Sequence, residues 1–275
     1  MNQLTVDENK CTGCGKCQER CGFKKVIHVN EAGKASFKKD RSECIECYHC
    51  LKVCPNDAIG SNGDNIKLFR VTDETSSVLK RHSCRMYNDK QIVKNDLNDL
   101  LQDANLAPWA YMDFRDRKYL VVTGKKLTEL RTILLKKINR ESKVFRTLIR
   151  IPFLPERRKA DLKFMAWCFT GTIKANKIYE QLFQGAPAVV LAVGPGKNPV
   201  SKVNCELAIM QLMILAEERG FGTCYSGYIE GYMNAISKFL RLPKNEKVFC
   251  GCMIGYPAAT YTNYIRRNDT SITWI

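Results

Sequence analysis

Two copies of one cysteine pattern constrain this chain more than any other feature of its sequence. Residues 11–21 read CTGCGKCQERC and residues 44–54 read CIECYHCLKVC, so C-x2-C-x2-C-x3-C occurs twice. Three cysteines at successive two-residue gaps fit three corners of a cubane iron–sulfur cluster, and the fourth thiolate must come from farther along the chain. The other copy supplies that thiolate, which ties the two halves of the module together.

This pairing predicts two 4Fe-4S clusters with four ligands each. The first set is Cys11, Cys14, Cys17 and Cys54, and the second is Cys44, Cys47, Cys50 and Cys21. A zinc site would use two separated C-x2-C pairs and would leave the extra cysteine of each run unexplained. Disulfides are not expected, because thiols stay reduced in the cytoplasm. His49, inside CYHC, is expected to be a solvent-facing spacer, since each thiolate quartet is complete without it.

These residues resemble the bacterial two-cluster ferredoxins over about residues 1–62. The stretch VIHVNEAGKASF alternates around a glycine-containing turn, as the short hairpin of such a fold would. Gly22 stands where a proline usually follows the fourth cysteine, which loosens a turn without removing a ligand. We therefore expect a two-cluster ferredoxin domain over residues 1–68 that transfers single electrons.

Charge and hydropathy restrict the partners of the chain. Lys and Arg number 44 against 28 Asp and Glu, and this excess could attract nucleic acid, an anionic surface, an acidic protein or an anionic substrate. No apolar run approaches the roughly 20 residues that cross a bilayer, and the start MNQLTVDENK is unlike a signal peptide. The expectation is a cytoplasmic protein with no membrane partner.

The remainder of the chain mixes helical and strand patterns. NDLNDLLQDANLAP predicts an amphipathic helix from Asn95 that stops at Pro108, and residues 127–150 predict a long basic helix. KYLVVTG, GAPAVVLAVGP and KVFCGCMIGYP predict strands, the first two of them buried. CELAIMQLMILAEERGFG is apolar on most sides, which predicts a central helix or one buried at a subunit interface. No G-x-G-x-x-G opens a helix after a strand, so a Rossmann domain is not supported.

Six of these segments, in this order and spacing, resemble the nitroreductase family of flavoproteins over about residues 74–270. They are RHSCRMY, LLQDANLAP, GAPAVVLAVG, AEERGFGTCYSGY, IGYP and IRR. The resemblance implies an α+β fold in which a nitroreductase-type domain, with a central, mainly antiparallel sheet flanked by helices, follows the small ferredoxin-like domain. It assigns residues 69–275 to an FMN-binding domain, and it implies a homodimer.

The resemblance also implies which residues bind FMN. Arg81, Ser83 and Arg85 would clamp the phosphate, with the backbone of His82 and Cys84 helping and with Arg266 or Arg267 completing the clamp. Guanidinium forks, a hydroxyl and backbone N–H groups match the charge and acceptor oxygens of a phosphate. Taken alone, KRHSCR would read as an exposed basic helix end, because charge runs are usually solvated. Ser226, Gly227 and Tyr228 would bring backbone amides to the redox edge of the flavin.

Other positions leave alternatives open. Met112 stands where family members commonly place an asparagine against the ring, so either Asp113 takes over that contact or the ring is held differently. Trp109, Tyr111 and Phe114 either stack on a planar substrate or pack in the core. Residues 151–184 are a candidate lid. The six cysteines outside the runs are expected to be small buried hydrophobes, namely Cys84, Cys168, Cys205, Cys224, Cys250 and Cys252.

Together these features predict an iron–sulfur flavoprotein oxidoreductase. Electrons from a ferredoxin, a flavodoxin or NAD(P)H would reach FMN and then a nitroaromatic, quinone, activated alkene or haloaromatic acceptor, and no side chain is predicted to be catalytic. One alternative is an electron-transfer or redox-sensing protein whose basic residues 125–163, with 13 Lys or Arg against 4 Asp or Glu, dock an acidic partner or nucleic acid. Nucleic acid is the less expected partner, because the aromatic interleaving of a single-strand groove is absent from the sequence. Another alternative is reversed flow, from NAD(P)H through FMN to the clusters.

Overall fold

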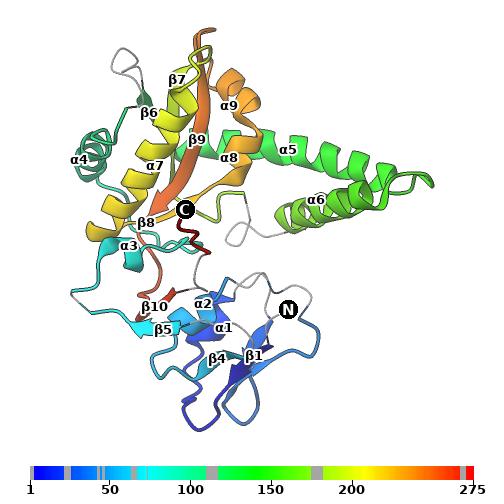
Figure 1. Cartoon of the computed structure of the whole chain (residues 1–275), viewed down its shortest axis with the longest axis vertical. Helices are drawn as coiled ribbons and strands as arrows, with labels where there is room; N and C mark the ends of the chain where they lie inside the picture. The colour runs from blue at the N-terminus through cyan, green and yellow to red at the C-terminus, as the bar shows by residue number, and fades with distance from the viewer. Residues whose placement is uncertain are drawn as a thin grey trace. The chain divides into compact units, whose positions relative to one another are not determined.

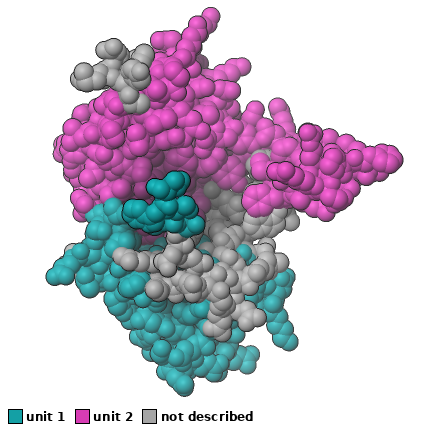
Figure 2. Space-filling view, viewed as in Figure 1, with its two compact units in different colours: residues 1–80, 259–275 teal, residues 81–258 magenta. Residues whose placement is uncertain are grey.

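The computed structural model describes residues 3–21, 26–41, 44, 47–62, 67–72, 74–109, 117–174, 182–266 and 271–275. The chain divides into two compact units, coloured separately in Figure 2. Unit 1 consists of Met1–Lys80 and Ala259–Ile275, and unit 2 of Arg81–Ala258. The division between residues 68 and 69 rests on motifs and stays a prediction, whereas contacts within the chain assign residues 69–80 and the C-terminal segment to unit 1.

Unit 1 is built, in the part that the structure describes, from short antiparallel strand pairs and short helices (Figure 1). β1 (Gln3–Val6) pairs with β4 (Ile59–Asn62), and β2 (Ile27–Val29) pairs with β3 (Ala35–Phe37). The second pair is the hairpin predicted from VIHVNEAGKASF. The helices are α1 (Lys16–Arg20), α2 (His49–Lys52) and α3 (Ser77–Lys80). The core of unit 1 lies between these elements and the cysteine runs.

The last strand of unit 1 comes from the end of the chain. β10 (Asn263–Arg266) pairs antiparallel with β5 (Lys67–Arg70), and the rings of Phe69 and Tyr264 stack across the pair with centroids 5.1 Å apart. The apolar residues of the C-terminal segment YTNYIRRNDTSITWI predict that this segment packs against the rest of the chain. This holds for β10, which pairs with β5. It is wrong for the last described residues, because Ile272, Trp274 and Ile275 are exposed.

Unit 2 is organised around one four-stranded sheet. The order is β6 (Lys118–Thr123), β7 (Ala188–Pro195), β9 (Glu246–Gly255) and β8 (Gly222–Tyr225), and every neighbouring pair is antiparallel. The predicted antiparallel sheet is therefore confirmed. β7 lies inside the sheet and is buried on both faces, as predicted. β6 is the exception, because it lies at the edge of the sheet and only Val122 in it is buried.

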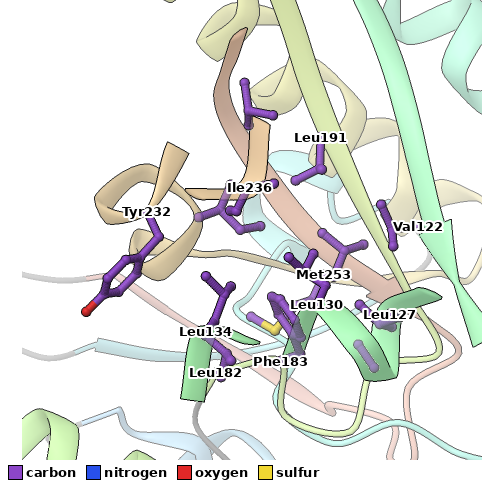
Figure 3. Packing of buried hydrophobic residues seen from close by; sticks show 14 of the residues in the cluster. Val122, Leu127, Leu130, Leu134, Leu182, Phe183, Leu191, Tyr232, Ile236 and Met253 are labelled. Carbon is purple, nitrogen blue, oxygen red and sulfur yellow. The ribbon is translucent and has the colours of Figure 1, made fainter. Parts of the chain in front are cut away.

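Helices cover both faces of this sheet. Alternate residues of β7 and β9 pack against α5 (Gly124–Leu148), α8 (Gly227–Gly231) and α9 (Met233–Phe239) on one face. Figure 3 shows this cluster, with Leu127, Leu130 and Leu134 of α5 among Phe183, Ile236 and Met253. The other face packs against the predicted amphipathic helix, α4 (Lys94–Ala104), and against α7 (Ser201–Glu218). The result is a three-layer arrangement with the sheet in the middle.

Two features of these helices bear on partners. α5 continues past the sheet and packs along α6 (Glu156–Lys174), as Figure 1 shows. α7 buries one side against the sheet and exposes Val203, Leu207 and Met210 on the other, each 40–48% exposed. In the part of the chain that the structure describes, no helix has the length and apolar character needed to cross a membrane.

Candidate cofactor sites

The first predicted cysteine set surrounds a small cavity of about 20 Å³ in unit 1. The N–H of Ala35 donates to Cys11 Sγ and the N–H of Ala58 donates to Cys54 Sγ, each at 3.3 Å. N–H···S hydrogen bonds of this kind stabilise the charge of a thiolate that ligates a cluster. The donor set and its backbone partners therefore fit a 4Fe-4S cluster. All four cysteines line this cavity, namely Cys11, Cys14, Cys17 and Cys54.

Glycine is required at one point of this loop. Gly13 has a φ of +70° and lies so close to Gly33 that an added Cβ would be 2.0 Å from the Gly33 carbonyl oxygen. Gly15, the N-cap of α1, has a φ of +72° but has no atom within 4 Å of the same position. The first glycine therefore permits a close backbone contact, whereas the second only permits a left-handed conformation.

Each cysteine run lies close to at least one cysteine of the other run. The pKa of the Cys17 thiol is raised to about 11, mainly by burial and in part by Cys54 of the second run and by Cys14 and Cys11. Burial likewise raises the pKa of the Cys50 thiol, with a further increase from neighbouring thiols that include Cys21 of the first run. Each run therefore has the fourth cysteine of the other run nearby. This is the arrangement that the cross-ligation prediction requires, and the ligand assignment itself stays a prediction.

His49 is not the solvent-facing spacer that the sequence suggested. Its side chain is 5% exposed, and its Nδ1 lies 2.9 Å from the hydroxyl of Tyr261, with the two rings edge to face. The N–H of Thr262 also donates to the Lys52 carbonyl at 3.2 Å. The expectation was wrong because the segment before β10 covers α2. The contact between His49 and Tyr261 joins residues more than 200 positions apart, and a local sequence pattern cannot predict it.

Asn263, at the start of β10, connects the end of the chain to the first cysteine set. It is 2% exposed, and its Nδ2 donates to the Cys54 carbonyl at 3.2 Å and to Asp57 Oδ1 at 2.9 Å. Arg70 of β5 forms an ion pair with the same carboxylate at 3.0 Å. Sequence reasoning missed Asn263, because its role depends on strand pairing across the whole chain.

The predicted phosphate clamp lies in unit 2, in an extended segment held between β8 and the chain that follows β9. The N–H of Cys84 donates to the Thr223 carbonyl at 2.8 Å, and the N–H of Ala258 donates to the Met86 carbonyl at 3.1 Å. Cys84 packs against Gly222, where an added Cβ would lie 2.6 Å from its Sγ. The N–H of Cys84 is therefore engaged within the protein, which leaves the predicted phosphate contacts to its neighbours.

The three clamp side chains gather around one buried thiol. Burial raises the pKa of Cys224, at the end of β8, whereas the charge of Arg85, a hydrogen bond with Ser83 and the charge of Arg81 lower it. An Arg85 Nη1 also donates to the Ser83 carbonyl at 3.3 Å. All three side chains are half-buried. The Ser83 hydroxyl is therefore within hydrogen-bond reach of Cys224, and the charges of both guanidinium groups act on that thiol. Two cations and a hydroxyl in one neighbourhood fit the charge and acceptor oxygens of a phosphate.

Two further residues of the predicted FMN site, His82 and Ser226, are buried near the clamp. His82 is buried, and its Nδ1 lies 3.9 Å from Glu217 Oε2. Ser226, the N-cap of α8, is 2% exposed, and its N–H donates to the Gly251 carbonyl at 3.2 Å. Its Oγ has no hydrogen-bond partner among the described residues. Gly227 is exposed and has open space where a side chain would lie, so the start of α8 could accept a ligand.

A cavity of about 540 Å³ opens in unit 2 directly after the clamp segment, a volume typical of ligand pockets. Tyr87 lines it and donates its hydroxyl to the Cys84 carbonyl at 2.9 Å, and burial raises the pKa of that phenol. Arg131 of α5 and Gln184 contribute polar groups that sequence reasoning missed. Gln184 has a φ of +52°, a left-handed conformation that is often found at functional sites. In the sequence, Gly185 after Gln184 indicates a turn, and this was the one feature that could have pointed to Gln184 as a site residue.

Several predicted site residues cannot be compared. Arg267 lies outside the described residues, and so do Met112, Asp113, Tyr111 and Phe114. The side chains of Arg266, in β10, and of Cys168, in α6, are also not described, and the lid stays a prediction. Trp109 packs its ring 4.1 Å from the Arg117 guanidinium carbon, which favours its packing role over substrate stacking. The other five cysteines outside the runs are buried, as predicted.

Comparisons with known proteins divide the chain in the same way. Residues 78–256 match the family model described as "Nitroreductase family", and residues 10–59 match the one described as "4Fe-4S dicluster domain". An uncharacterized ferredoxin of Methanocaldococcus jannaschii is 32% identical over 57 residues, which are 21% of this chain and 74% of that protein. An uncharacterized protein of the same organism is 39% identical over 57 residues, and the chain spans only 20% of its length.

Among solved structures, oxidized iodotyrosine deiodinase bound to FMN and 3-iodo-L-tyrosine superposes with a TM-score of 0.52 at 20% identity. The match covers 72% of this chain and 97% of that one. The likeness shows that the two proteins share a fold.

Proposed function

The chain belongs to the nitroreductase family and carries a 4Fe-4S dicluster domain, and from this premise we propose an FMN-dependent oxidoreductase that receives electrons through its two clusters. The acceptor is a small organic molecule of the nitroaromatic, quinone, activated alkene or haloaromatic class. One-electron steps at the clusters and two-electron reduction at the flavin are chemistry that the cofactors supply when bound. The protein holds the cofactors, orients them and controls access.

The observation that carries this proposal is that Arg81, Ser83 and Arg85 all act on the Cys224 thiol at the end of β8. Both guanidinium groups are half-buried on one short segment, and the cost of bringing like charges into one neighbourhood is offset when a dianion binds there. The cavity of about 540 Å³ is lined by Met86 and Tyr87, which directly follow the clamp in sequence, and we expect a molecule whose phosphate lies at the clamp to extend into it. A phosphate-bearing planar cofactor fits both features.

The proposal also specifies a second subunit, an electron donor and a further clamp residue. We propose a homodimer in which the exposed stripe of α7, formed by Val203, Leu207 and Met210, is covered by a second subunit, because such an apolar stripe is costly in water. The electron donor is a reduced ferredoxin or flavodoxin, and NAD(P)H is the alternative. Arg266 or Arg267 is proposed to complete the clamp, with separate alanine variants of the two deciding between them.

The decisive experiment uses anaerobically purified protein. The flavin and iron contents are measured, and reduced ferredoxin, NADH and NADPH are then compared as reductants of the bound flavin. The double variant Arg81→Ala/Arg85→Ala should lose FMN and keep its iron, because the clamp and the cysteine runs use different residues. Lys136→Ala/Arg140→Ala is the matched control, since it removes two exposed cations from α5.

The outcomes separate the alternatives. Protein that contains iron but never binds FMN would exclude the proposal and favour an electron-transfer or sensing role. Flavin reduced by NADPH but not by ferredoxin would reverse the direction of electron flow. Equal loss of FMN in the clamp variant and in the control would show that bulk charge, and not the clamp, holds the phosphate.

A further inference from the structure

The cavity in unit 2 contains one hydrogen-bond acceptor and one donor that the described residues leave unsatisfied. Gln184 is 9% exposed, and no described group hydrogen-bonds to its Oε1. The Nε of Arg131 is buried and likewise has no partner among the described residues. An unsatisfied buried polar group costs about 1–3 kcal/mol, so a native protein rarely keeps two beside one cavity without a ligand for them.

The rest of the cavity restricts what that ligand is. Leu127, Phe183, Ala186 and Pro187 give it apolar walls, and Figure 3 shows Leu127 and Phe183 within the packed cluster. A single ordered water would satisfy one or both polar atoms, but a volume of about 540 Å³ is many times that of one water. The occupant therefore has an apolar body and polar groups that both donate and accept hydrogen bonds, as the ring system of the proposed FMN does.

We propose that Gln184 and Arg131 bind the pyrimidine edge of the flavin ring, an inference that rests on the proposed function and extends it. That edge carries an N3–H donor between two carbonyl oxygens. Gln184 Oε1 accepts from N3–H, and the Arg131 guanidinium donates to the adjacent carbonyl oxygen. The two missing partners are thus supplied by one cyclic imide, in a cavity that begins where the phosphate clamp ends.

The electrostatics of the cavity agree with this assignment. Gly124, Leu127 and Thr128 place the first turns of the 25-residue helix α5 against the cavity, and the N-cap Thr123 makes no side-chain hydrogen bond there. The positive end of that helix and the Arg131 cation both favour negative charge at this edge. Asp89 is the acidic residue of the lining, and it is exposed. Charge that accumulates on the ring during reduction is therefore stabilised from this side.

The test uses purified full-length protein, stripped of flavin and titrated with FMN or with 3-methyl-FMN, in which a methyl group replaces the N3 proton. The wild-type protein should bind FMN at least ten-fold more tightly than 3-methyl-FMN. Gln184→Ala should weaken FMN binding about ten-fold and abolish the discrimination. Arg131→Gln should lower the reduction potential of the bound flavin, Arg131→Lys should restore part of it, and Arg140→Gln on the exposed side of α5 should leave it unchanged.

The possible results test separately the assignment of Gln184, the occupant of the cavity and the proposed function. Equal affinity of the wild-type protein for the two flavins would overturn the assignment of Gln184. An unchanged potential and unchanged affinities in both variants, with a raised KM for the acceptor, would show that the cavity takes the acceptor and overturn the proposal. No binding of FMN by the wild-type protein would instead refute the proposed function, so the two failures are distinguishable.

Discussion

Arg117 offers the sharpest test of what holds α4 and α7 together on one face of the sheet in unit 2. It is 7% exposed, and its guanidinium donates to the carbonyls of Asn105 at 2.9 Å, Ala107 at 3.3 Å and Asn204 at 2.6 Å. It also donates to the Asn105 side chain and stacks on Trp109. Asn105 is the C-cap of α4 and Asn204 lies in α7, so one side chain joins the two helices on that face of the sheet.

The cost of removing this cation follows from its contacts. Burial lowers the pKa of Arg117, because burial disfavours its charged form, so removing the hydrogen bonds alone would leave an unfavourable buried charge. Arg117→Met leaves three carbonyl acceptors unpaired, each worth about 1 kcal/mol, and loses a cation–π contact of about 0.5–1 kcal/mol. The expected loss is about 4 kcal/mol, which is about 8–16 °C in the melting temperature of a unit of this size.

The assay is thermal unfolding of the full chain with its cofactors, followed by circular dichroism. Arg117→Lys is the informative comparison, because it keeps the charge and loses the planar fork that reaches several carbonyls at once. We expect Lys to recover less than half of the loss. A melting temperature of Arg117→Met within 2 °C of the wild-type value, which corresponds to about 1 kcal/mol or less, would refute the reasoning, since the carbonyls would then have found other donors.

Three further predictions concern other parts of the chain. Gly13→Ala should cost the protein about half of its iron, because one of two clusters is lost, whereas Gly15→Ala should keep all of it and cost about 1 kcal/mol; equal iron contents would contradict the steric argument. Asn263→Leu should release iron to a chelator several-fold faster than wild type, because the Cys54 carbonyl and Asp57 lose their shared donor; an unchanged rate would remove Asn263 from the site. Burial raises the pKa of Tyr119 from 10.0 to about 12, and burial also raises the pKa of Tyr87 well above its usual value. Stability from these neutral phenols is therefore full below pH 10 and falls as the pH rises through the folded-state pKa values, so phenolate absorbance should appear together with unfolding; complete titration in folded protein near pH 10 would contradict this.

Elements with a strong local pattern were predictable from the sequence. The helix α4 buries Leu97, Leu100, Leu101 and Ala104, and their spacing places them on one face in any helix. β7 is a continuous apolar run bounded by glycine and proline, and such a run is typical of a strand that is buried on both faces, as β7 is inside this sheet. The clamp of Arg81, Ser83 and Arg85 was predicted through the resemblance, because KRHSCR alone reads as an exposed basic helix end, and it stays a prediction.

What the sequence did not predict depends on pairing between distant residues. β6 reads as a buried strand, but its position at the edge of the sheet exposes most of it, and edge position is a property of the sheet and not of the strand. Arg131 and Gln184 are 53 positions apart, and each alone is an ordinary polar residue near a turn or on a basic helix. Only the packing of α5 against the segment before β7 places both at one cavity.

The return of the chain to unit 1 changes how the two modules should be regarded. An N-terminal ferredoxin attached by one linker could be removed or exchanged by a single cut. Here unit 2 is inserted between Lys80 and Ala259, and the segment after it supplies β10, the contact to His49 and the donor to the Cys54 carbonyl. A fragment that ends at residue 80 would leave β5 as an unpaired edge and would leave buried polar groups without partners. Unit 1 is therefore complete only with the residues that follow unit 2, so a fragment that ends at residue 80 should be less stable than unit 1 in the full chain.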